Sequence, residues 1–232
     1  MYSTKKIKSS KKWPSFLKKS PITKRKTIEK AFAKVGLRNC SGDSDITVNE
    51  YYSDFECKPV KCKIVLSARP WDIATMSQRG ILSCQSWNES HRCNLIGSIM
   101  DPYTAIIYAT DGEKTKHGKR MVARSVVRLV YSNKTKRMAV YIDAPYTEED
   151  CVEHILHSAQ YREEFREFIA KRVKKGVEVI AKDSYAMEHK AYFIPMSKAV
   201  LDLDEEDQRS YRDTWFPYRK IERKKLFGKK AS

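Results

Sequence analysis

The chain contains little glycine or proline, with 8 of each among 232 residues. This composition excludes collagen-like and low-complexity proteins, in which these residues are in large excess. No stretch approaches the roughly 18 uncharged apolar residues of a membrane-spanning helix, so we expect no membrane partner. No apolar segment follows the basic N-terminus, which argues against a secretory signal and predicts a cytoplasmic protein.

The common catalytic signatures are also missing. The sequence has no P-loop, no G-x-G-x-x-G, no G-x-S-x-G and no H-E-x-x-H, which removes the usual nucleotide-binding and hydrolase motifs. Six cysteines without a secretory signal predict reduced thiols or metal ligands rather than disulfides. A zinc site remains an alternative to no cofactor, although its candidate ligands lack Cys-x2-Cys spacing: Cys57, Cys62, Cys84, His91 and Cys93.

The chain has enough apolar side chains to form a hydrophobic core, since 41% of its residues are hydrophobic and 13 are tyrosine. Periodicity predicts a helix at residues 27–35, strands at 104–110, 121–131 and 137–142, and a long helix at about 148–175. Shorter strands are expected at 63–66 and 191–194. We therefore predict an α+β fold in which an antiparallel three-strand meander (about 104–142) packs on the long helix. The expected organisation is a basic N-terminal arm with a short helix (1–44), one domain (45–200), and an acidic linker followed by a basic aromatic arm (201–232).

The net charge of +17 is concentrated at the two ends of the chain. Residues 1–38 hold 13 Lys/Arg and one acid, and residues 209–232 hold 9 against two, whereas the segment between them has a net charge of −2. Runs of like charge commonly serve as arms that contact a polyanion, and interleaved aromatic side chains can stack on bases. The predicted nucleic-acid-binding residues are Lys5, Lys6, Lys8, Lys11, Lys12, Trp13, Lys18, Lys19, Lys24, Arg25, Lys26, Arg219, Lys220, Arg223, Lys224 and Lys225. The alternatives are arms that dock on a protein and arms that act in targeting.

Two arginines lie on one predicted strand. Because side chains alternate along a strand, Val122, Arg124, Val126, Arg128 and Val130 should share one face. A guanidinium on an apolar face needs a carboxylate or a phosphate as partner. Asp101, Asp111 and Asp143 are the internal candidates, and the alternative is an anionic ligand held by Arg124, Arg128 and Arg69.

One segment resembles a known family. The elements Ser67-x-x-Pro70-x-Asp72, Met76-Ser77 and Ser83-Cys84, followed by an Arg-bearing strand, resemble uncharacterised proteins encoded by phages, plasmids and related bacterial mobile elements. The resemblance covers residues 66–146, and it departs at Leu82 and Gln85, where many members have an aromatic residue and a histidine. It implies a viral or mobile-element origin, hence a location in the host cytoplasm or the virion, and it implies no mechanism.

Three functions remain open from the sequence. The first is a non-enzymatic protein that binds the phosphate backbone through its arms with little sequence preference. The second is a virion or assembly component whose arms lace through neighbouring subunits. The third is an enzyme for a phosphate-bearing or nucleotide-like substrate, with Cys84 and Ser77 as candidate catalytic residues beside Arg69, Arg124 and Arg128. A thiol or hydroxyl nucleophile needs a nearby base, and spacing alone places none there.

Overall fold

A single long strand, β6, organises the sheet and is buried along its whole length (Ala123–Ser132). On one side β6 pairs with β3 (Thr104–Thr110) and β10 (Tyr192–Pro195), and on the other with β7 (Arg137–Ile142) and β8 (Tyr146–Thr147). All four pairings are antiparallel. The computed structural model describes residues 25–37, 43–51, 57–81, 83, 95, 97–99, 101–147, 154–181, 192–195 and 218–219.

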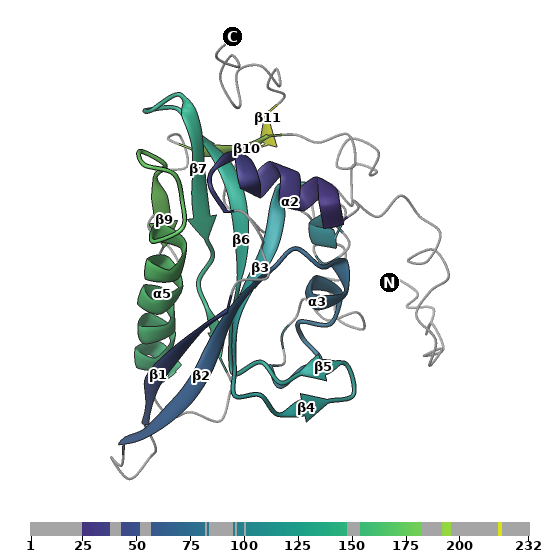
Figure 1. The fold of residues 1–232 in the computed structure, drawn as a ribbon, viewed down its shortest axis with the longest axis vertical. Coiled ribbons are helices and arrows are strands. Elements are labelled where there is room, and N and C mark those ends of the chain that lie inside the picture. The colour runs from purple at the N-terminus through teal and green to yellow at the C-terminus, as the bar shows by residue number, and fades with distance from the viewer. Residues whose placement is uncertain are drawn as a thin grey trace, which may run out of the picture.

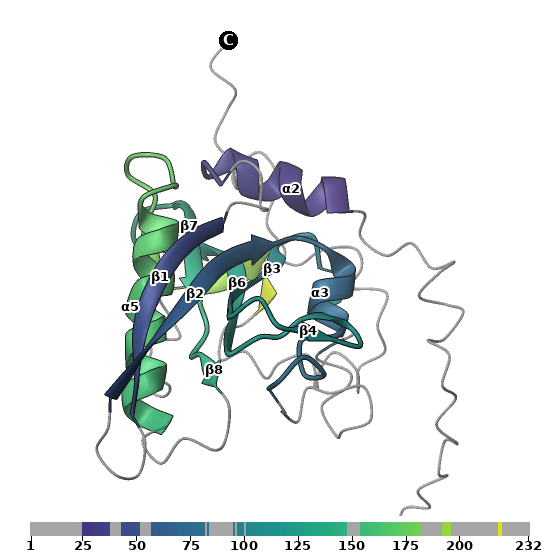
Figure 2. The same ribbon diagram turned by 60° about the horizontal axis from the view of Figure 1, so that its bottom comes forward.

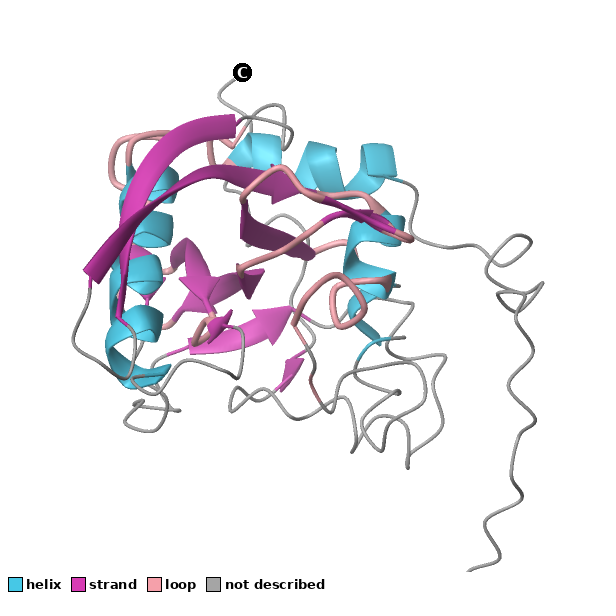
Figure 3. Ribbon diagram, turned by 90° about the horizontal axis from the view of Figure 1, so that it is seen from below, coloured by secondary structure: helices cyan, strands magenta, loops and turns pink. Residues whose placement is uncertain are grey.

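The remaining strands extend this sheet in both directions. A long hairpin, β1 (Asp43–Tyr51) and β2 (Cys57–Ser67), adds to the edge of β3. Two short parallel pairings, β7 with β9 (Val179–Ala181) and β10 with β11 (Tyr218–Arg219), make the nine-stranded sheet mixed. The sheet curls into a half-barrel (Figures 1 and 3).

Helices cover both faces of the sheet. On the face of the main core lie α2 (Arg25–Lys34) and α5 (His154–Ala170), which bury residues at helical spacing: Ile28 and Phe32 on α2, and Tyr161, Phe165 and Ile169 on α5. On the opposite face lies α3 (Pro70–Ala74), whose Ile73 packs in a second core cluster with Met76, Ile106 and Val126. In Figure 2, α5 lies at the left of the sheet, α2 across the top and α3 at the right.

The predicted fold, an antiparallel meander packed on one long helix, is wrong. Strands do lie at the three predicted positions, but they form the middle of a larger mixed and curled sheet. The hairpin of β4 (Lys114–Thr115) and β5 (Gly118–Lys119) also interrupts the expected meander between β3 and β6. The long helix ends at Ala170 rather than near residue 175, since residues 171–178 form turns.

The core includes the N-terminal helix as well as the sheet. Ile28 and Phe32 of α2 are fully buried, and the backbone N–H of Lys174 donates to the Val35 carbonyl at 2.8 Å, which joins the end of α2 to the turn after α5. A truncation that is meant to spare the body must therefore keep α2. Of the helices that the structure describes, none has both the length and the apolar character needed to cross a bilayer.

Candidate functional site

The alternation predicted for the arginine-bearing strand is confirmed. Ala123, Val127 and Leu129 of β6 face the main core, whereas Val126 packs in the second core cluster on the opposite face. Arg124 and Arg128 share the face of Val126 because they occupy positions i−2 and i+2 relative to it on the strand. Val122, which was expected on this face, precedes β6 and packs in the main core instead.

Arg124 is fully buried and is held by residues that follow α3. Its Nη2 donates to Ser77 Oγ at 3.1 Å and to Ser83 Oγ at 2.6 Å, and Nη1 lies 3.4 Å from Met76 Sδ. The guanidinium also lies 4.5 Å from the centre of the Tyr146 ring, a distance typical of a cation–π contact. The structure therefore brings together two predicted site residues, Ser77 and Arg124.

The hydroxyl of Ser77 has two polar neighbours in this cluster. Its hydroxyl contacts the Arg124 guanidinium and, at 2.7 Å, the Ser83 hydroxyl. A serine nucleophile is activated by a base that takes its proton, and neither of these two groups is such a base at neutral pH. These contacts fit a polar anchor between the loop after α3 and the centre of the sheet. Cys84 follows Ser83 directly but lies outside the described residues.

Arg128 lies four residues further along β6 and has different partners. Its Nε is 3.6 Å from Asp143 Oδ2, and its Nη1 donates to Thr104 Oγ1, which in turn donates to Asp101 Oδ2 at 2.8 Å. Two of the three predicted carboxylates therefore compensate this arginine, one directly and one through Thr104. The third, Asp111, instead pairs with Arg120 at 3.1 Å. Burial, and then the nearby Asp143 charge, raises the pKa of Tyr141, the cross-strand neighbour of Arg128.

The Ser67-x-x-Pro70-x-Asp72 motif forms the turn from β2 into α3. Ser67 ends β2, Pro70 begins the helix, and the Ser67 hydroxyl donates to Asp72 Oδ2 at 2.5 Å. Asp72 Oδ1 forms a buried ion pair with Arg79 Nη1 at 2.8 Å, and Arg79 Nε donates to the Lys119 carbonyl at 2.7 Å. The motif thus links β2, α3 and the β4–β5 hairpin through one network.

The network continues onto the sheet through Tyr108. The guanidinium carbon of Arg79 lies 5.1 Å from the centre of the Tyr108 ring. Burial raises the pKa of Tyr108, the Asp72 carboxylate raises it further, and the Arg79 cation opposes both. Arg79 had no role in the sequence interpretation because its partners lie 7 and 40 residues away in the chain. For Ser83, too, the sequence predicts no contact with Arg124, and the residue stands out only as part of the family pattern.

The other predicted site residues do not join this cluster within the described part of the chain. Arg69 is exposed, and its backbone contacts the network: its N–H donates to Ser67 Oγ and its carbonyl accepts from the Asp72 N–H at 3.0 Å. Cys62 is buried in the main core, on the opposite face of the sheet. The side chains of Cys57, Cys84, His91 and Cys93 lie outside the described residues, and no metal-binding group of His, Cys, Asp or Glu occurs among the residues that are described.

Most of the predicted nucleic-acid-binding residues also lie outside the described part of the chain. The exceptions are Arg25 and Lys26 in α2 and Arg219 in β11. Of these, Lys26 is exposed.

Comparison with known proteins leaves the chain without an assigned family. No protein-family model matches it, and neither the curated proteins nor the solved structures provide a significant match.

Proposed function

We propose that this chain is a nucleic-acid-associated protein of the phage or mobile-element type, which binds the phosphate backbone without strong sequence specificity. The arms supply the first support, because their net charges of +12 and +7 account for the whole basicity of the chain. Lysines and arginines that neutralise phosphates release condensed counterions, which drives binding independently of sequence.

The second and main support is the sign of the charge that the described residues expose. Among the side chains that the structure describes, 16 Lys/Arg are exposed but only three acids, Glu113, Glu163 and Glu167. All three acids already form ion pairs, Glu113 with Arg120, Glu163 with Arg166 and Glu167 with Lys171. The exposed cations are Lys26, Lys30, Lys34, Lys61, Lys63, Arg69, Lys114, Lys116, Lys119, Lys134, Lys136, Arg137, Arg166, Lys171, Lys174 and Lys175. Three of the cations counted here, Lys26, Lys30 and Lys34 of α2, also belong to the +12 of residues 1–38.

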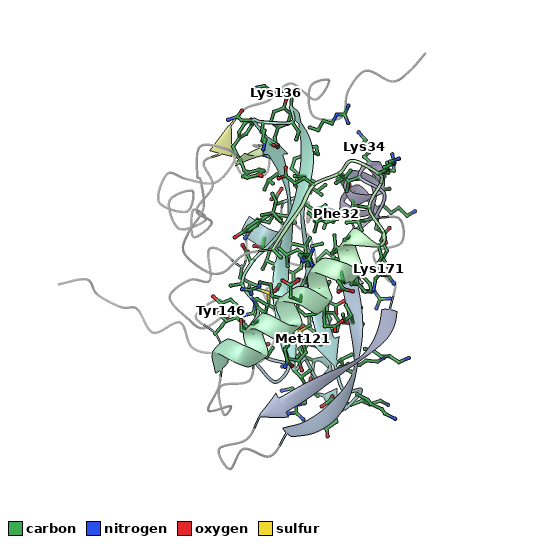
Figure 4. The ribbon with its side chains drawn as sticks, turned by 90° about the vertical axis from the view of Figure 1, so that its left-hand side faces the viewer. Phe32, Lys34, Met121, Lys136, Tyr146 and Lys171 are labelled. Atoms are coloured by element: carbon green, nitrogen blue, oxygen red, sulfur yellow. The ribbon has the colours of Figure 1, made fainter. Side chains whose placement is uncertain are left out.

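Several of these cations gather at one end of the molecule. This basic end comprises exposed side chains of α2, of the turn after α5 and of the turn between β6 and β7. The hydrogen bond from Lys174 to Val35 joins the first two, and a Cβ at Gly176 would lie 3.9 Å from Arg137, which joins the third. Figure 4 shows Lys136 at the top of the molecule, Lys34 below it and Lys171 further down, toward the middle of the view. Its members are Lys34, Lys134, Lys136, Arg137, Lys171, Lys174 and Lys175.

The test measures binding of fluorescently labelled single-stranded and duplex oligonucleotides by anisotropy at several salt concentrations. Removal of residues 1–24 deletes eight lysines but keeps α2 and its buried side chains. If all eight contact duplex phosphates, the slope of log affinity against log salt becomes less steep by about 7. The matched control keeps the full length and replaces the same eight lysines with glutamine, which separates the effect of charge from that of chain length.

Two results would overturn the proposal. One is an unchanged affinity and salt slope in both arm variants. The other is formation of rings or larger oligomers by the purified chain without nucleic acid, measured by light scattering after size-exclusion chromatography, which would favour the assembly component instead. The proposal expects larger species only when nucleic acid is added and salt is low.

A further inference from the structure

Trp71 is the single large hydrophobic side chain that is exposed among the described residues, with 45% of its surface accessible. An isolated exposed apolar residue is common and needs no explanation by itself. Trp71 differs because its indole is fixed in place. Its Nε1 donates to the His117 carbonyl at 2.9 Å, and its ring lies 6.2 Å from the His117 ring.

The backbone beneath Trp71 is also held firmly. Its carbonyl accepts hydrogen bonds from the Thr75 N–H and hydroxyl, and its neighbour Asp72 forms the buried ion pair with Arg79. Arg79 in turn donates to the Lys119 carbonyl, so the same network fixes the β4–β5 hairpin against α3. A flat aromatic surface that is already ordered loses little conformational entropy when it binds a partner.

The surroundings of this indole are strongly basic. The exposed lysines Lys114, Lys116 and Lys119 flank His117 on the hairpin, and Arg69 is exposed two residues before Trp71. The two carboxylates of the hairpin, Asp111 and Glu113, both bind Arg120 at 3.1 Å. Residues 111–120 therefore keep a net charge of +2, with three lysines and Arg120 against these two carboxylates. Figures 1 and 2 show the hairpin beside α3.

We propose that Trp71 and the lysines of the β4–β5 hairpin form a binding surface for single-stranded nucleic acid, with one base stacked on the indole. This inference rests on the proposed function and names the form of nucleic acid that the body recognises. Bases in a duplex are stacked on one another, so an exposed indole finds a free base face only on a single strand. The neighbouring lysines contact the phosphates that flank the stacked base. A cationic partner, which an indole face can also attract, is repelled by these lysines.

The test compares full-length chains by anisotropy with labelled oligo-dT, oligo-rU and a duplex of equal length. The variant Trp71→Ala should weaken single-strand binding by about 5- to 150-fold, the range that corresponds to about 1–3 kcal/mol for one stacked base. Trp71→Phe should recover much of this loss, because a phenyl ring still stacks. Neither variant should alter duplex binding or the salt slope, since no phosphate contact is removed.

The role of the lysines is tested through the salt dependence of binding. The triple variant Lys114→Gln, Lys116→Gln and Lys119→Gln should make the single-strand salt slope less steep by about 2, if each lysine contacts one phosphate. A control with Lys134→Gln, Lys136→Gln and Arg137→Gln at the basic end removes the same charge away from Trp71. After this control change, Trp71→Ala should cause the same loss in single-strand affinity as it does in the unmodified chain.

Three results would overturn the inference. The first is unchanged single-strand binding in Trp71→Ala with a normal thermal unfolding transition. The second is an equal loss of affinity for single strand and duplex in Trp71→Ala that Trp71→Phe does not restore. The third is competition by polyglutamate that also depends on Trp71, which would identify an acidic protein as the partner. The proposed function fails separately, through the arm variants, since those keep Trp71 and the hairpin.

Discussion

Asp72 and Arg79 form an ion pair that is almost closed to solvent, with 2.8 Å between Oδ1 and Nη1 and side-chain exposures of 11% and 2%. Each partner is also bound elsewhere, Asp72 by the Ser67 hydroxyl and Arg79 by the Lys119 carbonyl. Because isolated buried charges are costly, the pair stabilises the fold only while both members are present. It therefore holds α3, and Trp71 with it, against the sheet and the hairpin.

We predict that Asp72→Asn lowers the free energy of unfolding by about 3–5 kcal/mol, because it leaves the Arg79 cation buried without its counter-charge. Urea denaturation at neutral pH measures the change. Asp111→Asn is the matched control, since its pair with Arg120 is partly exposed, and we expect about 0–1 kcal/mol there. Similar losses at the two positions would show that the Asp72 pair is no more important than a surface pair.

The two serines that bind Arg124 should act as a unit. Each of Ser77→Ala and Ser83→Ala removes a hydrogen bond to a buried cation and should cost about 1.5–3 kcal/mol. Because the two hydroxyls also contact each other at 2.7 Å, the double variant should lose less than the sum of the single variants, by about 0.5–3 kcal/mol. A double-mutant cycle in urea measures this coupling. Strict additivity would show that the serines hold Arg124 independently.

The face alternation of β6 and the helix of α2 were predictable from sequence because each depends on residues close together in the chain. Alternation along β6 indicates which of its residues share a face, and the spacing of Ile28 and Phe32 indicates the buried side of α2. The partner of Arg128 was predictable for a similar reason, since Asp143 follows β7, the next strand of the sheet.

The extent of the sheet was not predictable from such patterns. Strands β8, β9 and β11 have only two or three residues, too few to show a period, and β10 pairs with a part of β6 about 60 residues earlier. The β1–β2 hairpin is rich in charged and polar residues, so the sequence predicts only residues 63–66 of β2 and none of β1. The sequence does not predict the contacts of Arg79, because they form only when α3 and the β4–β5 hairpin pack together.

Gly118 allows the hairpin to approach Arg79, and this contact can be tested. Gly118 has φ of 144°, and a Cβ there would lie 3.1 Å from the guanidinium carbon of Arg79. Gly112 has φ of 92°, but a Cβ there would meet no atom within 4 Å, so Gly112→Ala measures backbone strain alone. We expect Gly118→Ala to destabilise the protein by about 1–3 kcal/mol more than this control, through crowding. Thermal unfolding of both variants provides the comparison, and equal losses would contradict the contact.

The buried tyrosine Tyr141 should make the fold sensitive to alkaline pH. Burial, followed by the Asp143 charge, raises the pKa of Tyr141 in the folded state above its unfolded value of about 10. A raised folded pKa gives stability that is fully present below pH of about 10 and is lost as pH rises further, because only the unfolded chain then releases the proton. This group alone should cost about 1.4 kcal/mol per pH unit above that point.

The comparison of wild type with Tyr141→Phe isolates this contribution, since other groups that titrate at high pH are common to both chains. Urea unfolding at pH 8, 9, 10 and 10.5 should show that wild type loses stability faster than the variant above about pH 10, with parallel curves below it. Tyr108→Phe should change the pH dependence in the same direction, because burial and Asp72 also raise the pKa of Tyr108. Identical pH profiles for wild type and Tyr141→Phe would mean that this hydroxyl ionises as readily in the folded chain as in the unfolded one.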